Sequence, residues 1–288
     1  MIDFIPPLEN GRGLVENLDI ERYHALEPVS KSQLDDLNVS PFHFYSWHRD
    51  PLRPVRESKS GQLEGNLAHC GILEPDAFQD RYVVGPAVNR NTKVWRDFVE
   101  THENAVAIQP DQYETAMRQA DSVRALPEIQ AYLARGKAEV SAFWTDPITG
   151  VECRCRPDFV HPLSKSSVVL LDVKTFSSVD PDDFRRQAAR KRYHVQDTFY
   201  SAGFSEAARV TVEKFIFVVV ESAWPYAAAA YTLGNESREQ GFLEWRRLLD
   251  VYEECVRTKT WPGYAEKTTQ IDLPSWAFTS QEVEISYV

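Results

Sequence analysis

Residues 156–200 read RPDFVHPLSKSSVVLLDVKTFSSVDPDDFRRQAARKRYHVQDTFY, and this stretch carries the strongest indication of the fold. Its centre, residues 168–174, is an apolar run that contains Asp172 and ends at Lys174. Such a run is typical of a strand buried on both faces. Because side chains alternate along a strand, Asp172 and Lys174 point to the same face. A second carboxylate, Asp158, follows a proline on the preceding predicted strand.

These three side chains predict a site for a divalent cation. A carboxylate inside an apolar strand needs a partner charge or a metal, since a lone charge is costly to remove from water. We expect Asp158 and Asp172 to bind Mg²⁺, which prefers oxygen ligands, with Mn²⁺ as a substitute. Lys174 would orient the attacking water or stabilise charge that develops at a phosphorus atom, and pairing with Asp172 is compatible with either role. The predicted chemistry is phosphodiester hydrolysis.

The order of these motifs resembles the PD-(D/E)xK nuclease superfamily. The superfamily motif stands here as Pro157-Asp158 followed by Asp172-Val173-Lys174. The flanking residues resemble RecE (exonuclease VIII)-like nuclease domains, which are related to RecB-type and lambda exonuclease-type nucleases. These flanking motifs are Gly65-x-x-x-His69, Leu73-Glu74-Pro75 and Tyr193-His194-Val195-Gln196-Asp197-x-x-Tyr200. The resemblance spans residues 28–262 and implies an α/β fold, with a central mixed sheet flanked by helices and an N-terminal helical elaboration.

The resemblance also implies roles for five further positions. His69 corresponds to a histidine that binds metal, although a lone histidine on a helix is more often structural. Glu139 would bind a metal directly or through water, and the Val173 carbonyl would complete the coordination. Gln196 and Tyr200 would contact the phosphate of the strand being cut, or order the lysine.

A recombination exonuclease is the activity that the resemblance implies. It would degrade linear double-stranded DNA from 5′ to 3′, processively, and leave 3′ single strands for a single-strand annealing protein. The family suggests a closed homo-oligomeric ring, with a tetramer favoured, in the cytoplasm of a bacterium and of phage or prophage origin. Three alternatives stay open: a structure-specific or restriction-type endonuclease, a non-catalytic DNA-binding module, and an unrelated α/β enzyme with a chance motif.

The chain is acidic, with a net charge of -11, so a uniform surface would repel DNA. Basic residues gather just after the predicted metal-site strand, and we expect them to contact DNA rather than form only a solvated helix face. They are Arg185, Arg186, Arg190, Lys191 and Arg192. Arg192, Gln196 and Tyr200 follow one another at helical spacing, with Arg185 on nearly the same stripe.

A second candidate contact with DNA is the start of a predicted helix at Ser30, Lys31 and Ser32. Helix N-termini attract phosphate, although simple capping by Ser30 explains the pattern equally well.

The four cysteines, Cys70, Cys153, Cys155 and Cys255, include no CxxC pair. We therefore expect buried thiols and no iron–sulfur cluster. The chain shows no signal-peptide pattern and no apolar stretch of the roughly 20 residues that a bilayer requires, so no membrane association is expected.

The remaining pattern predicts a single nuclease domain over residues 28–262, between an irregular arm over 1–27 and a tail over 263–288. Helices are expected over 30–40, 61–73 and 111–135, and residues 75–95 are expected to be irregular. A hairpin of two strands should cover 138–145 and 151–160, followed by the strand at 168–174. A helix from Asp180 to about Gly203, a strand over 214–221 and a helix over 237–258 complete the core.

Overall fold

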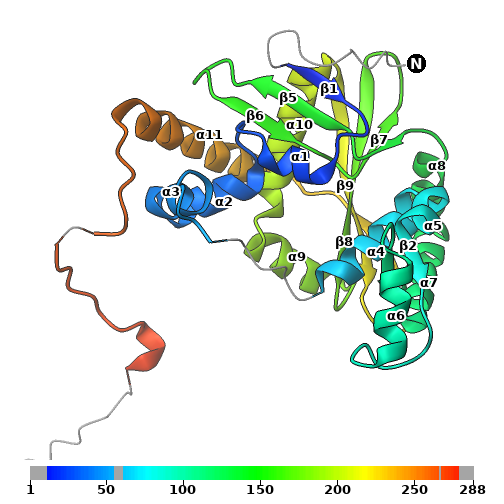
Figure 1. Ribbon diagram of the computed structural model, residues 1–288. Helices are drawn as coiled ribbons and strands as arrows, with labels where there is room; N and C mark the ends of the chain where they lie inside the picture. Colours follow the sequence, from blue (N-terminus) through cyan, green and yellow to red (C-terminus); the bar gives the residue numbers. More distant parts are fainter. Residues whose placement is uncertain (1–11, 55–60, 266, 279–288) are drawn as a thin grey trace, which may run out of the picture.

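The computed structural model describes residues 12–54, 61–265 and 267–278. Its centre is a mixed sheet with the strand order β10-β9-β8-β7-β4. The bounds are Ala228–Tyr231 for β10, Thr211–Glu221 for β9, Ser167–Phe176 for β8, Phe159–Pro162 for β7 and Lys137–Ala138 for β4. β8 and β9 are parallel, and the other neighbouring pairs are antiparallel. Helices lie on both sides of this sheet (Figure 1), which confirms the predicted α/β architecture.

β8 is the buried strand that the apolar run predicts, and its two faces belong to different halves of the core. Val168 and Leu170 pack on the side of α10 (Tyr193–Ala208) and α11 (Asn235–Thr258). Val169 and Leu171 pack on the side of α4 (Gln62–Leu73) and α7 (Pro110–Arg124). By the same alternation, Asp172 and Lys174 project toward α10.

The two strands of the predicted hairpin are each split in two, so the prediction of one continuous hairpin is wrong. The first becomes β4 and β5 (Ser141–Thr145), and the second becomes β6 (Glu152–Cys155) and β7. β5 and β6 join β1 (Gly13–Val15) in a separate sheet with the order β1-β5-β6. The chain bends at Glu139, whose φ is 53°, and at Pro157, which has no N–H for a ladder. Both bends lie beside predicted site residues.

The helix predicted from Asp180 to about Gly203 is also two helices. α9 (Pro181–Arg190) begins as predicted, because the Asp180 carboxylate accepts from the backbone N–H of Asp182 at 2.9 Å. The chain breaks at Arg192, which takes a left-handed conformation with a φ of 53° before α10. Arg185 and Arg192 therefore do not share a helical stripe with Gln196, and that prediction is corrected.

The N-terminal arm, expected to be irregular, contains β1 and α1 (Ile20–Ala25) within its described part. Two buried arginines of the β6 region hold it. Arg154 donates to the carbonyl of Leu26, and Arg156 donates to the carbonyl of Leu18 at 2.8 Å. Sequence patterns within the arm do not show this anchoring, because its donors lie more than 100 residues away. Residues 1–11 of the predicted arm lie outside the described residues.

The helix predicted from Ser30 is α2 (Lys31–Val39), where the Ser30 N–H donates to the Gln33 side chain at 2.9 Å. α3 (Pro41–His48) follows it directly.

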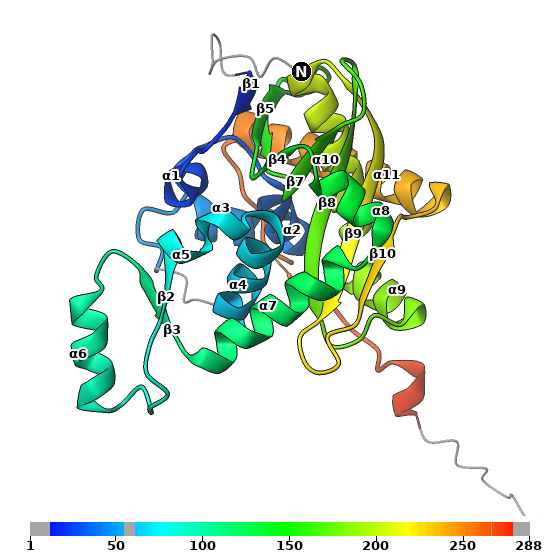
Figure 2. The same ribbon diagram turned by 90° about the vertical axis from the view of Figure 1, so that its right-hand side faces the viewer.

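Residues 75–95 are more ordered than expected. They contain η1 (Pro75–Ala77), α5 (Phe78–Arg81), β2 (Tyr82–Val84) and the start of α6 (Lys93–Thr101). β2 pairs in parallel with β3 (Val106–Ile108), and α6 connects the two strands. Figure 2 shows α6 projecting from the body. α7 and α8 (Pro127–Leu133) account for the helical pattern over 111–135.

The C-terminal segment leaves the body after α11. Trp261 still packs on the body of the protein, where its ring is stacked on that of Phe44 with the ring centroids 5.3 Å apart. The chain then extends away (Figure 1), and η2 (Ser275–Ala277) is a regular element within it. Residues 279–288 of the predicted tail lie outside the described part of the chain. Within residues 12–54, 61–265 and 267–278, every helix is too short or too polar to span a bilayer.

Candidate active site and metal centre

The β7–β8 ladder brings the two predicted carboxylates together. The last antiparallel pair is Phe159 opposite Leu171, and the next residues in that register are Asp158 and Asp172. Because β7 begins at Phe159, the Val173 N–H meets no strand carbonyl there and donates to Asp158 Oδ2 at 2.6 Å. Asp158 is thus fixed at the end of the ladder by the backbone of the strand that carries Asp172.

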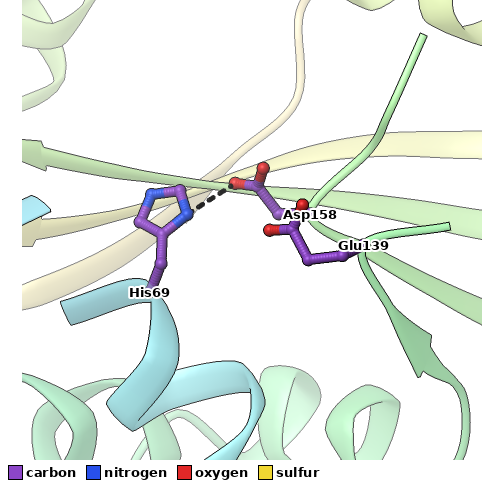
Figure 3. Close-up of side chains that lie close together, drawn as sticks. All are labelled: His69, Glu139 and Asp158. Carbon is purple, nitrogen blue, oxygen red and sulfur yellow. Dashed lines mark ion pairs between the residues drawn. The ribbon is translucent and has the colours of Figure 1, made fainter. Parts of the chain in front are cut away.

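A histidine and two carboxylates converge at this point (Figure 3). One potential ligand atom from each of His69, Glu139 and Asp158 lies within 4.8 Å of the others. His69 comes from α4, Glu139 from the bend after β4, and Asp158 from the bend before β7. His69 Nδ1 lies 3.5 Å from Asp158 Oδ2. The structure therefore brings together three of the five residues predicted to bind metal.

Asp172 lies beside this cluster rather than within it. Its side chain is 2% exposed and forms an ion pair through Oδ2 with Lys174 Nζ. Gln196 Nε2 donates to Oδ1 at 2.6 Å. Oδ2 already contacts the Lys174 ammonium, so a divalent cation that bound this buried oxygen would share it with the lysine. The imidazole and the two carboxylates of the cluster, with the Asp172 carboxylate beside them, form a donor set that fits a hard divalent ion.

Burial and neighbouring carboxylates together set the electrostatics of the site. Burial raises the pKa of Asp158 to about 6, and the neighbouring Asp172 carboxylate is the next cause of that rise. Burial raises the pKa of Glu139 to about 8, with Asp158 as the next cause. Desolvation lowers the pKa of Lys174, but the carboxylates of Asp172 and Asp158 outweigh it and raise that pKa overall. Lys174 is therefore held as a cation among acids.

Tyr193, the first residue of α10, also contacts the site. Lys174 Nζ lies 4.9 Å from the centroid of the Tyr193 ring, which has the geometry of a cation–π contact. The sequence pattern gives Tyr193 no role, because the contact exists only once α10 packs on β8. Tyr200, one turn beyond Gln196, is partly buried and packs edge-to-face on Phe215, and its pKa is raised by burial.

Arg156 is another site residue to which the sequence pattern gives no role. Its Nε donates to Ser141 Oγ at 2.8 Å, and its guanidinium lies 4.2 Å from the Tyr23 ring centroid. One guanidinium nitrogen lies 3.9 Å from Glu139 Oε2. This buried cation therefore lies within ion-pair distance of the Glu139 carboxylate at the bend between the sheets. In the sequence, the feature that could have indicated a site role for Arg156 is its position two residues before Asp158.

The residues predicted to contact DNA fall into two groups. Ser30 and Ser32, with hydroxyls 3.1 Å apart, lie near the α9–α10 junction, because Lys31 Nζ donates to the Lys191 carbonyl at 2.8 Å. Arg192 at this junction is 15% exposed and pairs with Asp35 at 3.0 Å and Glu244 at 2.9 Å. Its charge is compensated, and it links α2, α10 and α11.

The second group lies on α9 and at its end. Arg190 and Lys191 are exposed, whereas Arg185, also exposed, pairs with Asp182 at 2.9 Å. The four thiols are buried, as predicted, and belong to α4, β6 and α11.

Comparison with known proteins identifies the domain. Residues 30–274 match the family model described as a PDDEXK-like domain of unknown function (DUF3799). No curated protein matches the chain in sequence. A similar solved structure is the crystal structure of a "Putative exonuclease" from Eubacterium rectale, with 12% identity and a TM-score of 0.55 over 90% of this chain and 97% of that one.

At that identity the likeness shows the fold alone. A second solved structure, that of SSO0001, is 14% identical over 67% of this chain and 88% of that one, and its TM-score of 0.28 is too low to bear on the fold. The family match, however, covers most of the chain and includes Asp158, Asp172 and Lys174, which agrees with the resemblance to PD-(D/E)xK nucleases. The chain is thus a member of the family of PDDEXK-like domains of unknown function (DUF3799).

Proposed function

We propose that this protein is a metal-dependent deoxyribonuclease. The observation that supports this most directly is the His69–Glu139–Asp158 cluster beside the buried Asp172–Lys174 pair. The family match to a nuclease-like domain and the presence of ligands for a hard cation point to the same chemistry. A divalent ion, when bound, polarises a phosphoryl oxygen and makes a water more acidic. His69, Glu139, Asp158 and Asp172 would hold the ion, preferably Mg²⁺ or Mn²⁺.

The protein's own residues would prepare the phosphate for attack. Lys174 is kept cationic by Asp172 and Asp158, so it can stabilise the negative charge that grows on the phosphate oxygens. Gln196 fixes the Asp172 carboxylate by its hydrogen bond, and the Tyr193 ring limits the positions open to the Lys174 ammonium. Arg156 orients Glu139.

We further propose that the substrate is linear double-stranded DNA, degraded as an exonuclease from 5′ to 3′ and leaving 3′ single strands for an annealing protein. The resemblance to RecE-like domains and the description of the Eubacterium rectale relative as a "Putative exonuclease" support this. The test is cleavage of linear duplex labelled at the 5′ or the 3′ end, beside a covalently closed circle, with Mg²⁺ and with EDTA.

Release of the 5′ label as mononucleotides from linear DNA alone supports the proposal. Cleavage of the covalently closed circle would show instead that the protein is an endonuclease. Binding without cleavage in Mg²⁺ and in Mn²⁺ would show that it is a DNA-binding module.

A closed ring, with a tetramer favoured, is proposed as the working state. The chain has a net charge of -11, and its exposed Arg190 and Lys191 lie together at the end of α9. Rotational symmetry would gather these residues around one axis and raise the local attraction for DNA. Light scattering tests the ring: a mass near 33.0 kDa during processive digestion refutes it.

A further inference from the structure

The turn between β9 and β10 presents a large aromatic side chain to solvent. Trp224 is 74% exposed, which is unusual for a side chain that could bury so much apolar surface. Figure 2 shows this turn at the lower end of the central sheet. A single exposed apolar side chain needs no explanation in general. Whether Trp224 serves a function therefore depends on how rigidly it is held and on where it lies relative to the metal site.

The turn is held firmly on both of its sides. Backbone bonds join Glu221 N–H to the Ala227 carbonyl at 2.9 Å and Tyr226 N–H to the Ala223 carbonyl at 2.8 Å. The Tyr226 hydroxyl lies 3.3 Å from Thr115 Oγ1 on α7, and Gln119 of the same helix donates to the Glu221 carbonyl at 2.9 Å. The position of the turn is therefore fixed relative to α7.

The indole itself is also oriented. The Arg118 guanidinium lies 5.8 Å from the Trp224 ring centroid, and the Tyr226 ring meets the indole edge-on at 6.2 Å. Arg118 is in turn held by Glu114 at 2.6 Å. A ring that is oriented by neighbours and still mostly exposed can stack on a flat partner at little entropic cost.

The turn stands at the same edge of the sheet as the metal site. β8 and β9 are parallel, with Lys174 opposite Val219, and Ser222 N–H donates to the Phe176 carbonyl at 2.8 Å. Trp224 follows Val219 by five residues, so it lies at most about 17 Å along the chain from the level of Lys174, at about 3.3 Å per residue. Along the strand direction, this limit corresponds to no more than about five nucleotides of a stacked strand, at about 3.4 Å each.

We propose that Trp224 is a nucleobase-stacking subsite for the single-stranded part of the substrate, beyond the scissile phosphate. This rests on the proposed nuclease function. Every base presents a flat π-face, so such a platform binds strands without sequence preference. The Arg118 guanidinium beside the ring is paired with Glu114, so we expect the subsite to bind through stacking rather than through attraction for the flanking phosphate.

The test compares Trp224→Ala, Trp224→Phe and a matched control, Trp276→Ala, whose tryptophan is 85% exposed but lies on the C-terminal segment. Binding of fluorescein-labelled oligo(dT) of about 12 nucleotides, long enough to span both sites, is measured by anisotropy in EDTA. We expect Trp224→Ala to weaken binding by about 5- to 150-fold, the range for loss of one stacked base. Trp224→Phe should retain most of the affinity, and Trp276→Ala should match the parent.

An abasic strand of the same length separates stacking from phosphate contact. The parent and Trp224→Ala should bind it equally. The proposal would be overturned if the parent and Trp224→Ala bound oligo(dT) equally, or if Trp224→Ala lost as much affinity for the abasic strand as for oligo(dT). It would also be overturned if Trp224→Ala changed the mass measured by light scattering, because the turn would then be an interface between copies of the chain. If the parent fails to cut DNA in Mg²⁺ or Mn²⁺, the proposed function itself fails; if it cuts and Trp224→Ala binds oligo(dT) like the parent, this subsite alone is refuted.

Discussion

Replacing Lys174 with alanine should affect stability and catalysis separately, because the lysine is both the partner of a buried acid and a candidate catalytic group. Its loss leaves the 2% exposed Asp172 carboxylate with the Gln196 hydrogen bond but without a compensating charge. Removing one partner of a buried ion pair costs about 3–5 kcal/mol. We therefore expect the free energy of unfolding in EDTA, measured in urea by circular dichroism, to fall by about that amount.

A matched control is available on the neighbouring strand. Lys214 of β9 pairs with Glu128 at 3.3 Å, and both side chains are more than half exposed. Exposed pairs contribute less than about 1 kcal/mol, so Lys214→Ala should unfold almost like the parent and cut DNA at the parent rate.

The double variant Asp172→Asn/Lys174→Met distinguishes the two roles. It removes both charges at similar volume, so most of the lost stability should return. Cleavage of linear duplex in Mg²⁺ should stay at least about 10²-fold below the parent in the single and the double variant, because the charge that stabilises the phosphate is absent from both. Near-parent cleavage by folded Lys174→Ala would refute the assignment of the site, and unchanged stability would refute the buried-pair reasoning.

Four further outcomes are expected. His69→Ala should weaken binding of Mn²⁺, followed by calorimetry, by about 10-fold or more, and an unchanged affinity would remove His69 from the ligand set. EDTA should abolish cleavage and added Mg²⁺ should restore it, so activity that survives metal stripping contradicts a metal centre. Replacing Arg190 and Lys191 with glutamine should reduce the salt dependence of DNA binding by about 0.9 in log–log slope for each phosphate that the protein no longer neutralises. Arg192→Ala should chiefly destabilise the fold instead, because Arg192 pairs with Asp35 and Glu244. Burial raises the pKa of Asp197 to about 6, above the ordinary 3.8, so the folded state takes up a proton here and stability falls as the pH rises from about 4 to about 6. Asp197→Asn should remove up to about 3 kcal/mol of that pH dependence in urea titrations, and a curve parallel to the parent's would contradict it.

Local sequence was sufficient to predict the central strand and the chemistry that it carries. An apolar run with Asp172 and Lys174 two residues apart specifies a buried strand with two charges on one face, because alternation is a local property of extended chain. The Asp180-Pro181 start of α9 was likewise predictable, since the cap and the first turn lie within three residues of each other.

Tertiary packing, by contrast, sets where the chain bends and which distant groups meet. The splits at Glu139 and Arg192 depend on left-handed backbone conformations that non-glycine residues adopt only when their surroundings stabilise them, and local propensity does not report such surroundings. The anchoring of α1 by Arg154 and Arg156 depends on contacts across more than 100 residues of sequence. His69, Glu139 and Asp158 converge only because a helix and two bends meet at the end of the β7–β8 ladder, and Tyr193 and Trp224 gain their proposed roles only from what packs beside them.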